Sequence, residues 1–144
     1  YLTEKLSIFD FLHTPIIRKG SEHGFYLYPM KFENSKIGIS RELFVQALQF
    51  EGISVGEGYT KPLYLEPMFQ SQIAYGNQHC PFSCPLYKGN VDYSKGKCPN
   101  AETMYFDKII TTDICKYPNK KEDIDELVSA IEKVISCKED LTNS

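Results

Sequence analysis

Four side chains of metal-binding types stand in the middle of the chain: His79, Cys80, Cys84 and Cys98. One imidazole and three thiolates could close a tetrahedral zinc site. The spacing argues against it, because three residues separate Cys80 from Cys84, a proline follows each, and no second close pair occurs. The chain has five cysteines, an odd number, so we predict reduced thiols and no metal. A structural metal, or a disulfide from Cys80 to Cys84 or Cys98, is the alternative.

Covalent catalysis has weaker support in the sequence. A cysteine nucleophile would need a base such as His13, His23 or His79, and no local signature supports such a pair. Lys61 stands close to aromatic residues, and a desolvated lysine amine can form a Schiff base. Its neighbours offer no apolar pocket, so we interpret Lys61 as a solvated loop lysine. These residues alone therefore favour a catalytic role neither for the histidines nor for Lys61.

Tyrosines are concentrated in a long irregular segment, from about 56 to 99. It opens with Val55 to Phe69, in which two glycines and two prolines interrupt any long helix or strand. So long an irregular connection is uncommon in a compact domain unless it is functional or covered by a partner. We therefore expect the segment to place aromatic and polar groups in a site that lies largely outside this chain. Its tyrosines are Tyr59, Tyr64, Tyr75, Tyr87 and Tyr93.

Helical and strand patterns flank that segment. Ser40 is predicted to cap one helix, which Gly52 ends in a left-handed conformation, and Asn119 with Glu122 is predicted to form a capping box. Pro29 predicts an edge strand or a bulge. We expect helices over 2–12, 41–51, 100–106 and from 119 onward, and strands over 25–32, 53–55 and 108–113.

The order of these elements predicts an α/β (α+β) domain of two layers, in which helices cover a small, mostly antiparallel sheet. At 144 residues the chain is one domain by size. We assign 1–137 to the domain and 138–144 to a frayed tail.

Composition excludes several classes of function. A net charge of -3 with scattered lysines argues against nucleic acid as a partner. No apolar run approaches the roughly twenty residues of a membrane span, and the start is not a signal peptide, so we expect a cytoplasmic protein. The chain begins inside a predicted helix without a methionine, which suggests a fragment.

Several motifs in order, running nearly end to end, resemble the small C-terminal domain of DegT-type (DegT/DnrJ/EryC/StrS) aminotransferases. The matching stretches are 26–32, 39–48, 51–59, 62–67, 98–102 and 121–128. The resemblance implies the C-terminal domain of a fold-type I enzyme whose large N-terminal domain, absent here, carries pyridoxal phosphate and the Schiff-base lysine. It also implies a homodimer in aminosugar or nucleotide-sugar biosynthesis, with glutamate or glutamine as amino donor and a keto sugar or keto cyclitol as acceptor.

The site residues that the resemblance implies are few. Many family members have a histidine near the sugar where this chain has Tyr64, and a phenol does not shuttle protons near neutral pH as imidazole does. Tyr59 would line the same mouth, so we expect Tyr59 and Tyr64 to bind substrate. The large domain and a second subunit are the expected partners, and no cofactor is expected on this fragment. A sugar dehydratase of the same family, or a non-enzymatic metal- or protein-binding module built on Cys80, Cys84 and Cys98, is the alternative.

Overall fold

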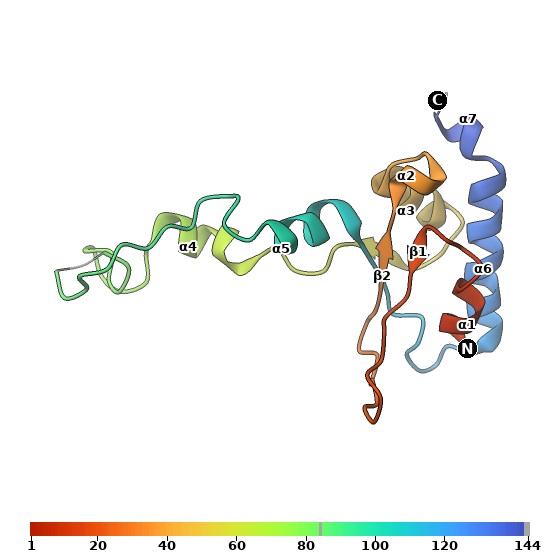
Figure 1. Cartoon of the computed structure of the whole chain (residues 1–144), viewed down its shortest axis with the longest axis horizontal. Coiled ribbons are helices and arrows are strands. Elements are labelled where there is room, and N and C mark those ends of the chain that lie inside the picture. The colour runs from red at the N-terminus through yellow and green to blue at the C-terminus, as the bar shows by residue number, and fades with distance from the viewer. Residues whose placement is uncertain (84, 143–144) are drawn as a thin grey trace.

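The computed structural model describes residues 1–83 and 85–142, and it contains a four-stranded antiparallel sheet in the order β1-β2-β4-β3 (Figure 1). The predicted α+β class with a mostly antiparallel sheet is confirmed. The elements are α1 (Leu2–Leu6), β1 (Leu12–His13), β2 (Tyr28–Phe32), α2 (Asn34–Ile37), α3 (Arg41–Phe50), β3 (Val55–Glu57), η1 (Leu63–Leu65), α4 (Pro67–Ser71), α5 (Pro99–Thr103), the π-helical turn η2 (Met104–Lys108), β4 (Ile109–Thr112), α6 (Lys121–Ser136) and α7 (Lys138–Thr142).

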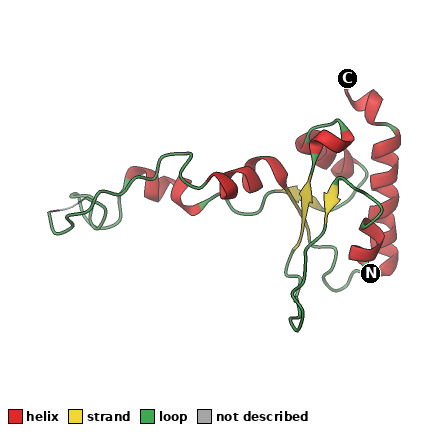
Figure 2. Ribbon diagram, viewed as in Figure 1, coloured by secondary structure: helices red, strands yellow, loops and turns green. Residues whose placement is uncertain are grey.

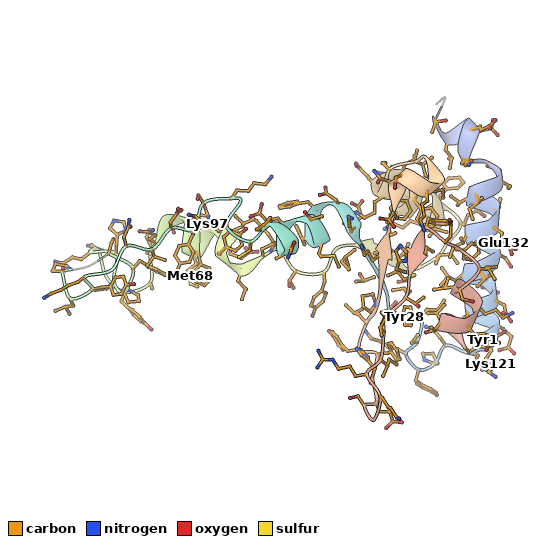
Figure 3. The ribbon with its side chains drawn as sticks, in the orientation of Figure 1. Tyr1, Tyr28, Met68, Lys97, Lys121 and Glu132 are labelled. Atoms are coloured by element: carbon orange, nitrogen blue, oxygen red, sulfur yellow. The ribbon has the colours of Figure 1, made fainter. Side chains whose placement is uncertain are left out.

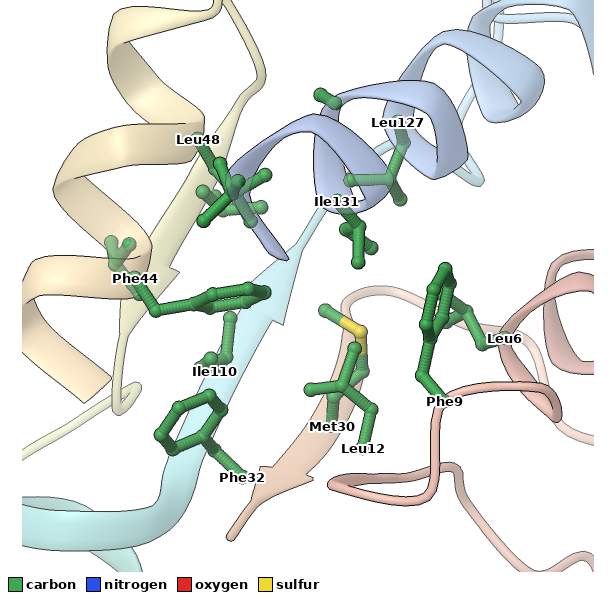
Figure 4. Close-up of a cluster of buried hydrophobic side chains, with 14 of the residues drawn as sticks. Leu6, Phe9, Leu12, Met30, Phe32, Phe44, Leu48, Ile110, Leu127 and Ile131 are labelled. Atoms are coloured by element: carbon green, nitrogen blue, oxygen red, sulfur yellow. The ribbon is translucent and has the colours of Figure 1, made fainter. Parts of the chain in front are cut away.

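One face of the sheet forms the hydrophobic core together with α1, α3 and α6 (Figure 4). Alternate residues of a strand point to opposite faces, so Met30 and Phe32 of β2 lie beside Ile110 of β4. Helix α3 adds Phe44, whose ring meets Phe32 at 5.1 Å between centroids. These side chains are almost fully buried, which makes the sheet and its helices one unit, called the body below.

Local signals placed the boundaries of α3 correctly. Ser40 Oγ accepts the Leu43 amide at 3.1 Å, and Gly52 has a φ of 86°, both as predicted. Helix α6 begins later than predicted. The Asn119 amide donates to Lys116 in a turn, and Asp123 instead of Glu122 accepts the amide of Lys120 at 2.5 Å.

Both chain ends differ from the prediction. The first helix ends at Leu6 instead of Leu12, because Leu12 pairs with Phe32 as part of β1. Strand β2 is shorter than the predicted 25–32 and lies between β1 and β4. Within the described residues β1 pairs with Lys31 and Phe32 alone, so Pro29 has no strand partner on the β1 side. The predicted frayed tail contains α7, whose Leu141 packs on the core, while 143–144 lie outside the described residues.

Residues 58–108, called the arm below, project away from the body between β3 and β4 (Figures 1 and 2). The arm holds a small cluster of its own, in which the rings of Phe69, Phe82 and Tyr93 lie 5.3–6.2 Å apart. Phe82 and Leu65 are buried there, whereas side chains such as Met68 cover the outside (Figure 3). The irregular segment is therefore folded on itself, with short helical turns.

Arg41 joins the arm to the body. Its guanidinium, 9% exposed, donates to the backbone oxygens of Tyr105 (2.8 Å), Phe106 (2.6 Å) and Ile109 (3.0 Å). It also pairs with Glu57 Oε2 at 2.9 Å. Four partners from η2, β4 and β3 thus share one side chain at the root of the arm.

In the described part of the chain, none of the helices combines the length and apolar character that crossing a bilayer requires.

We predict that Arg41→Met lowers the free energy of unfolding by about 3 kcal/mol, because it leaves buried carbonyl oxygens and Glu57 without their donor. About 3 kcal/mol is the low end of the range for removing one partner of a buried ion pair, and we choose it because the Glu57 side chain is 34% exposed. Urea unfolding followed by circular dichroism measures the change. Arg18→Met, at an exposed position, is the matched control and should be neutral. Equal stability of the two variants would contradict the assigned role of Arg41.

A second prediction concerns Gly58, which has a φ of 63° and lies where the chain enters the arm. A Cβ at this position would lie 2.9 Å from Cδ2 of Tyr105, so Gly58→Ala adds a steric overlap to backbone strain. Gly20→Ala is the control, because Gly20 also has a positive φ (80°) but open space around it. We expect Gly58→Ala to cost about 1–3 kcal/mol more than Gly20→Ala in the same unfolding measurement.

Candidate functional site

A cavity of about 200 Å³ lies at the root of the arm. Tyr59, 63% exposed, stands at the cavity, with Met104 and Ile109 among the residues on its other sides. The backbone holds this wall in place, since the Gly58 amide donates to the Ile109 oxygen at 2.7 Å. The predicted substrate-binding residue Tyr59 therefore does line a cavity. The full lining is Tyr59, Thr60, Pro62, Ala101, Met104, Tyr105 and Ile109.

Tyr64 lies on the same arm but is not among the residues that line this cavity. Its hydroxyl donates a short hydrogen bond to Oε1 of Glu102, which joins the outgoing and returning halves of the arm. The same oxygen accepts the backbone amide of Gly96 at 2.6 Å. Glu102 is only 8% exposed, and Tyr64 is half-buried. The Tyr64 hydroxyl thus already has a partner inside the chain.

These contacts shift both groups away from their ordinary ionisation. Burial raises the pKa of the Tyr64 hydroxyl to about 12, and the adjacent Glu102 carboxylate adds to the increase. The hydrogen bond from Tyr64 lowers the pKa of Glu102, with the Gly96 amide acting in the same direction. Near neutral pH the pair is therefore a neutral phenol bonded to a carboxylate, which can orient a ligand but does not transfer protons.

A second cavity, of about 620 Å³, adjoins the first on the face of the sheet opposite the core. Met104 and Ile109 line both cavities, so the two cavities adjoin each other, and together they are called the hollow beside the arm. The second cavity includes His13, which bonds Glu33 through Nε2 at 2.8 Å, and Lys31. The polar side chains of this lining are His13, Thr14, Lys31 and Glu33, and β4 and η2 add the apolar Ile109 and Met104.

Sequence reasoning missed the two groups that organise this region. Arg41 lies within the 39–48 motif and Glu102 within the 98–102 motif. The sequence predicts a helix start at Arg41 and a short helix around Glu102, but no contact for either side chain. Apart from Gly96, which is 6 positions from Glu102, their partners are 16 to 68 positions away in the chain, and no local pattern reports such contacts.

The cysteine-rich tip of the arm departs from the prediction of reduced thiols. Cys80 is disulfide-bonded, whereas Cys98 is a free, exposed thiol and His79 is exposed. The chain turns back here, with the Tyr75 amide bonded to the Cys80 oxygen at 3.0 Å, and spacing alone did not reveal this turn. Cys84 lies outside the described residues. Among residues 1–83 and 85–142, no group of three or more metal-binding side chains comes together.

Comparison with known proteins supports a domain-level likeness. No protein-family model matches the chain. An uncharacterized protein of Methanocaldococcus jannaschii is 28% identical over 134 residues, a match that covers 92% of this chain and 29% of that protein. The crystal structure of a DegT DnrJ EryC1 StrS aminotransferase from Brucella abortus matches with a TM-score of 0.57 at 20% identity. That match covers 92% of this chain and 28% of the aminotransferase chain.

The chain thus spans less than a third of the length of either protein and has the fold of a DegT-like C-terminal domain.

We predict that the Gly96 amide proton reports the titration of Glu102. Because the folded pKa of Glu102 is depressed, its carboxylate stabilises the arm above the unfolded value of about 4.3. That stabilisation is lost as the pH falls through the folded pKa. Tyr64→Phe removes the main donor, so the Gly96 shift should titrate at a higher pH than in the unaltered chain when followed by ¹⁵N NMR.

Tyr59→Phe is the control for this titration. Tyr59 is an exposed tyrosine of the same arm, whereas the donors to Glu102 Oε1 are Tyr64 and Gly96. It should leave the Gly96 midpoint unchanged. A midpoint that Tyr64→Phe does not move would show that Tyr64 does not control the carboxylate.

Proposed function

We propose that this chain is the small C-terminal domain of a pyridoxal-phosphate-dependent aminotransferase. The acceptor would be a keto sugar or keto cyclitol, the amino donor glutamate or glutamine, and the setting cytoplasmic aminosugar or nucleotide-sugar synthesis. The observation that carries the proposal is the fold likeness to the Brucella abortus aminotransferase over 92% of the chain. The motifs shared in order with DegT-type enzymes support it.

The proposed role of the domain is to supply contacts. The arm exposes large apolar side chains well away from the core, among them Tyr59, Leu63, Ile73 and Tyr75 at 57–74% exposure. Exposed apolar groups of this kind mark interaction sites. We propose that they meet the large domain of the same protein and a second subunit, and that Tyr59 and Tyr64 contribute to the substrate side of the site.

This chain alone does not fit pyridoxal phosphate. The cofactor needs a lysine within a pocket and several donors for its phosphate group. Lys31 lies in the larger cavity, whose lining contains no arginine and a single hydroxyl side chain, that of Thr14. Lys133 lies in a groove of the body and is bonded to Glu51 at 2.6 Å. We therefore place the cofactor and its chemistry on a separate domain and assign no reaction step to residues of this chain.

The test uses the protein encoded by the whole reading frame that contains this chain. We expect it to bind pyridoxal phosphate as an imine that borohydride reduces, and to convert glutamate to 2-oxoglutarate only when a keto sugar is present. The 144-residue chain with added cofactor should do neither.

Tyr59→Phe in the longer protein should raise KM for the sugar more than it lowers kcat. Tyr26→Phe is the control, because Tyr26 is also an exposed tyrosine.

Other outcomes have clear meanings. Loss of water from the sugar without consumption of glutamate would identify a dehydratase of the same family. A reading frame with no cofactor domain, or a purified protein holding stoichiometric zinc, would overturn the aminotransferase proposal.

A further inference from the structure

The larger cavity, of about 620 Å³, is within the size range of small-molecule sites. Its floor is a row of side chains across three strands, because His13 pairs with Lys31 and Lys31 pairs with Ile109 in the sheet register. Residues paired across strands lie side by side on one face. Met104 of the π-helical turn and Pro15 of the β1–β2 connection also line the cavity. The cavity therefore combines apolar surface with one polar edge.

At the polar edge, His13 and Glu33 satisfy each other. His13 Nε2 lies 2.8 Å from Glu33 Oε2, and the Glu33 side chain is 29% exposed. The hydrogen bond from His13 lowers the pKa of Glu33, and the charges of Lys31 and Lys108 act in the same direction. The carboxylate is thus charged, with the imidazole as its direct partner.

Lys31 contrasts with the other lysines near carboxylates. Lys5, Lys97 and Lys133 each have a carboxylate oxygen within 3.0 Å of the amine. Lys31 is half-buried in the cavity floor, yet within the described residues its amine makes neither a hydrogen bond nor an ion pair. An ammonium beside an apolar cavity that has no direct partner among the described residues favours an anion next to it.

We propose that this cavity binds a small organic monocarboxylate. The carboxylate contacts the Lys31 amine, and the carbon chain lies on Pro29, Met104 and Ile109. One ammonium balances a single negative charge. A phosphate monoester, with nearly two charges at neutral pH, would face the Glu33 carboxylate and would find no arginine among the lining residues. This binding belongs to the 144-residue chain alone, so it stands or fails independently of the aminotransferase proposal.

The experiment titrates the ¹⁵N-labelled 144-residue chain with butyrate, 1-butanol and butyl phosphate at neutral pH. Butyrate should shift the amide signals of Lys31 and Ile109, whereas butanol, which has a similar chain without the charge, should bind about tenfold more weakly or not at all. Lys31→Met should weaken butyrate binding about tenfold, and Lys31→Arg should retain it, since the charge is kept. Lys88→Met, which removes an exposed arm lysine, is the matched control and should bind as the unaltered chain does.

Each remaining result decides against the proposal. Equal binding of butanol and butyrate would show an apolar site without anion recognition, and tighter binding of butyl phosphate would assign a phosphate site. Unchanged butyrate binding in Lys31→Met, or no shift at Lys31 and Ile109 at millimolar butyrate, would also overturn it. If Lys31→Met does not fold, Lys31→Gln replaces it, and retained binding in that variant has the same meaning.

Discussion

The arrangement of the candidate site depends on the buried guanidinium of Arg41. A guanidinium offers five N–H donors in a fixed plane and keeps its charge, so one side chain can hold several acceptors at set angles. Here it holds the carbonyl oxygens of Tyr105 and Phe106, where the returning half of the arm ends, and Glu57, where the outgoing half begins. A lysine ammonium does not present its donors in such a fixed plane. The hydrogen bonds of this one residue thus link both halves of the arm to the sheet.

The body and the arm are stabilised in different ways. The body has a continuous apolar core between the sheet and the helices, with side chains such as Phe44 and Ile131 almost fully buried. The arm has a small ring cluster and several polar contacts, among them the Tyr64–Glu102 bond and the Lys97–Asp92 ion pair, and it leaves much of its apolar surface exposed. A segment with few buried contacts gains order when a partner covers it. The same feature that makes the arm a weak folding unit makes it suitable as an interface.

The features predicted correctly are those determined by neighbours in the chain. The Ser40 cap, the Gly52 helix end and the strand pattern before Phe32 depend on a few adjacent residues, and all are present. The antiparallel layers follow from the order of such elements. The start of α6 was misplaced by one residue although it is local, since Asp123 caps Lys120. The end of the first helix was wrong because a distant partner decides it: pairing with Phe32 places Leu12 in a strand.

The candidate site could be predicted from the sequence only in part, because some of its contacts join residues that are far apart in the chain. Tyr59, which the resemblance to DegT-type enzymes implied, lines a cavity. The bond between Tyr64 and Glu102 spans 38 positions, and the disulfide of Cys80 depends on how the arm tip turns. Neither contact can be inferred from neighbouring residues alone.

The hollow beside the arm is a consequence of how the sheet is covered. Helices α1, α3 and α6 all pack on one face, and on the opposite face, with Lys31 and Ile109, residues of the arm root and of the β1–β2 connection line the larger cavity. The short β1 leaves β2 without a neighbour at Pro29, which widens that hollow. Because Arg41 and Gly58 hold the arm root against β4, Met104 becomes a wall shared by both cavities. A ligand in one cavity would therefore contact the same η2 turn that carries the arm, and any partner that moves the arm would also reshape the ligand site.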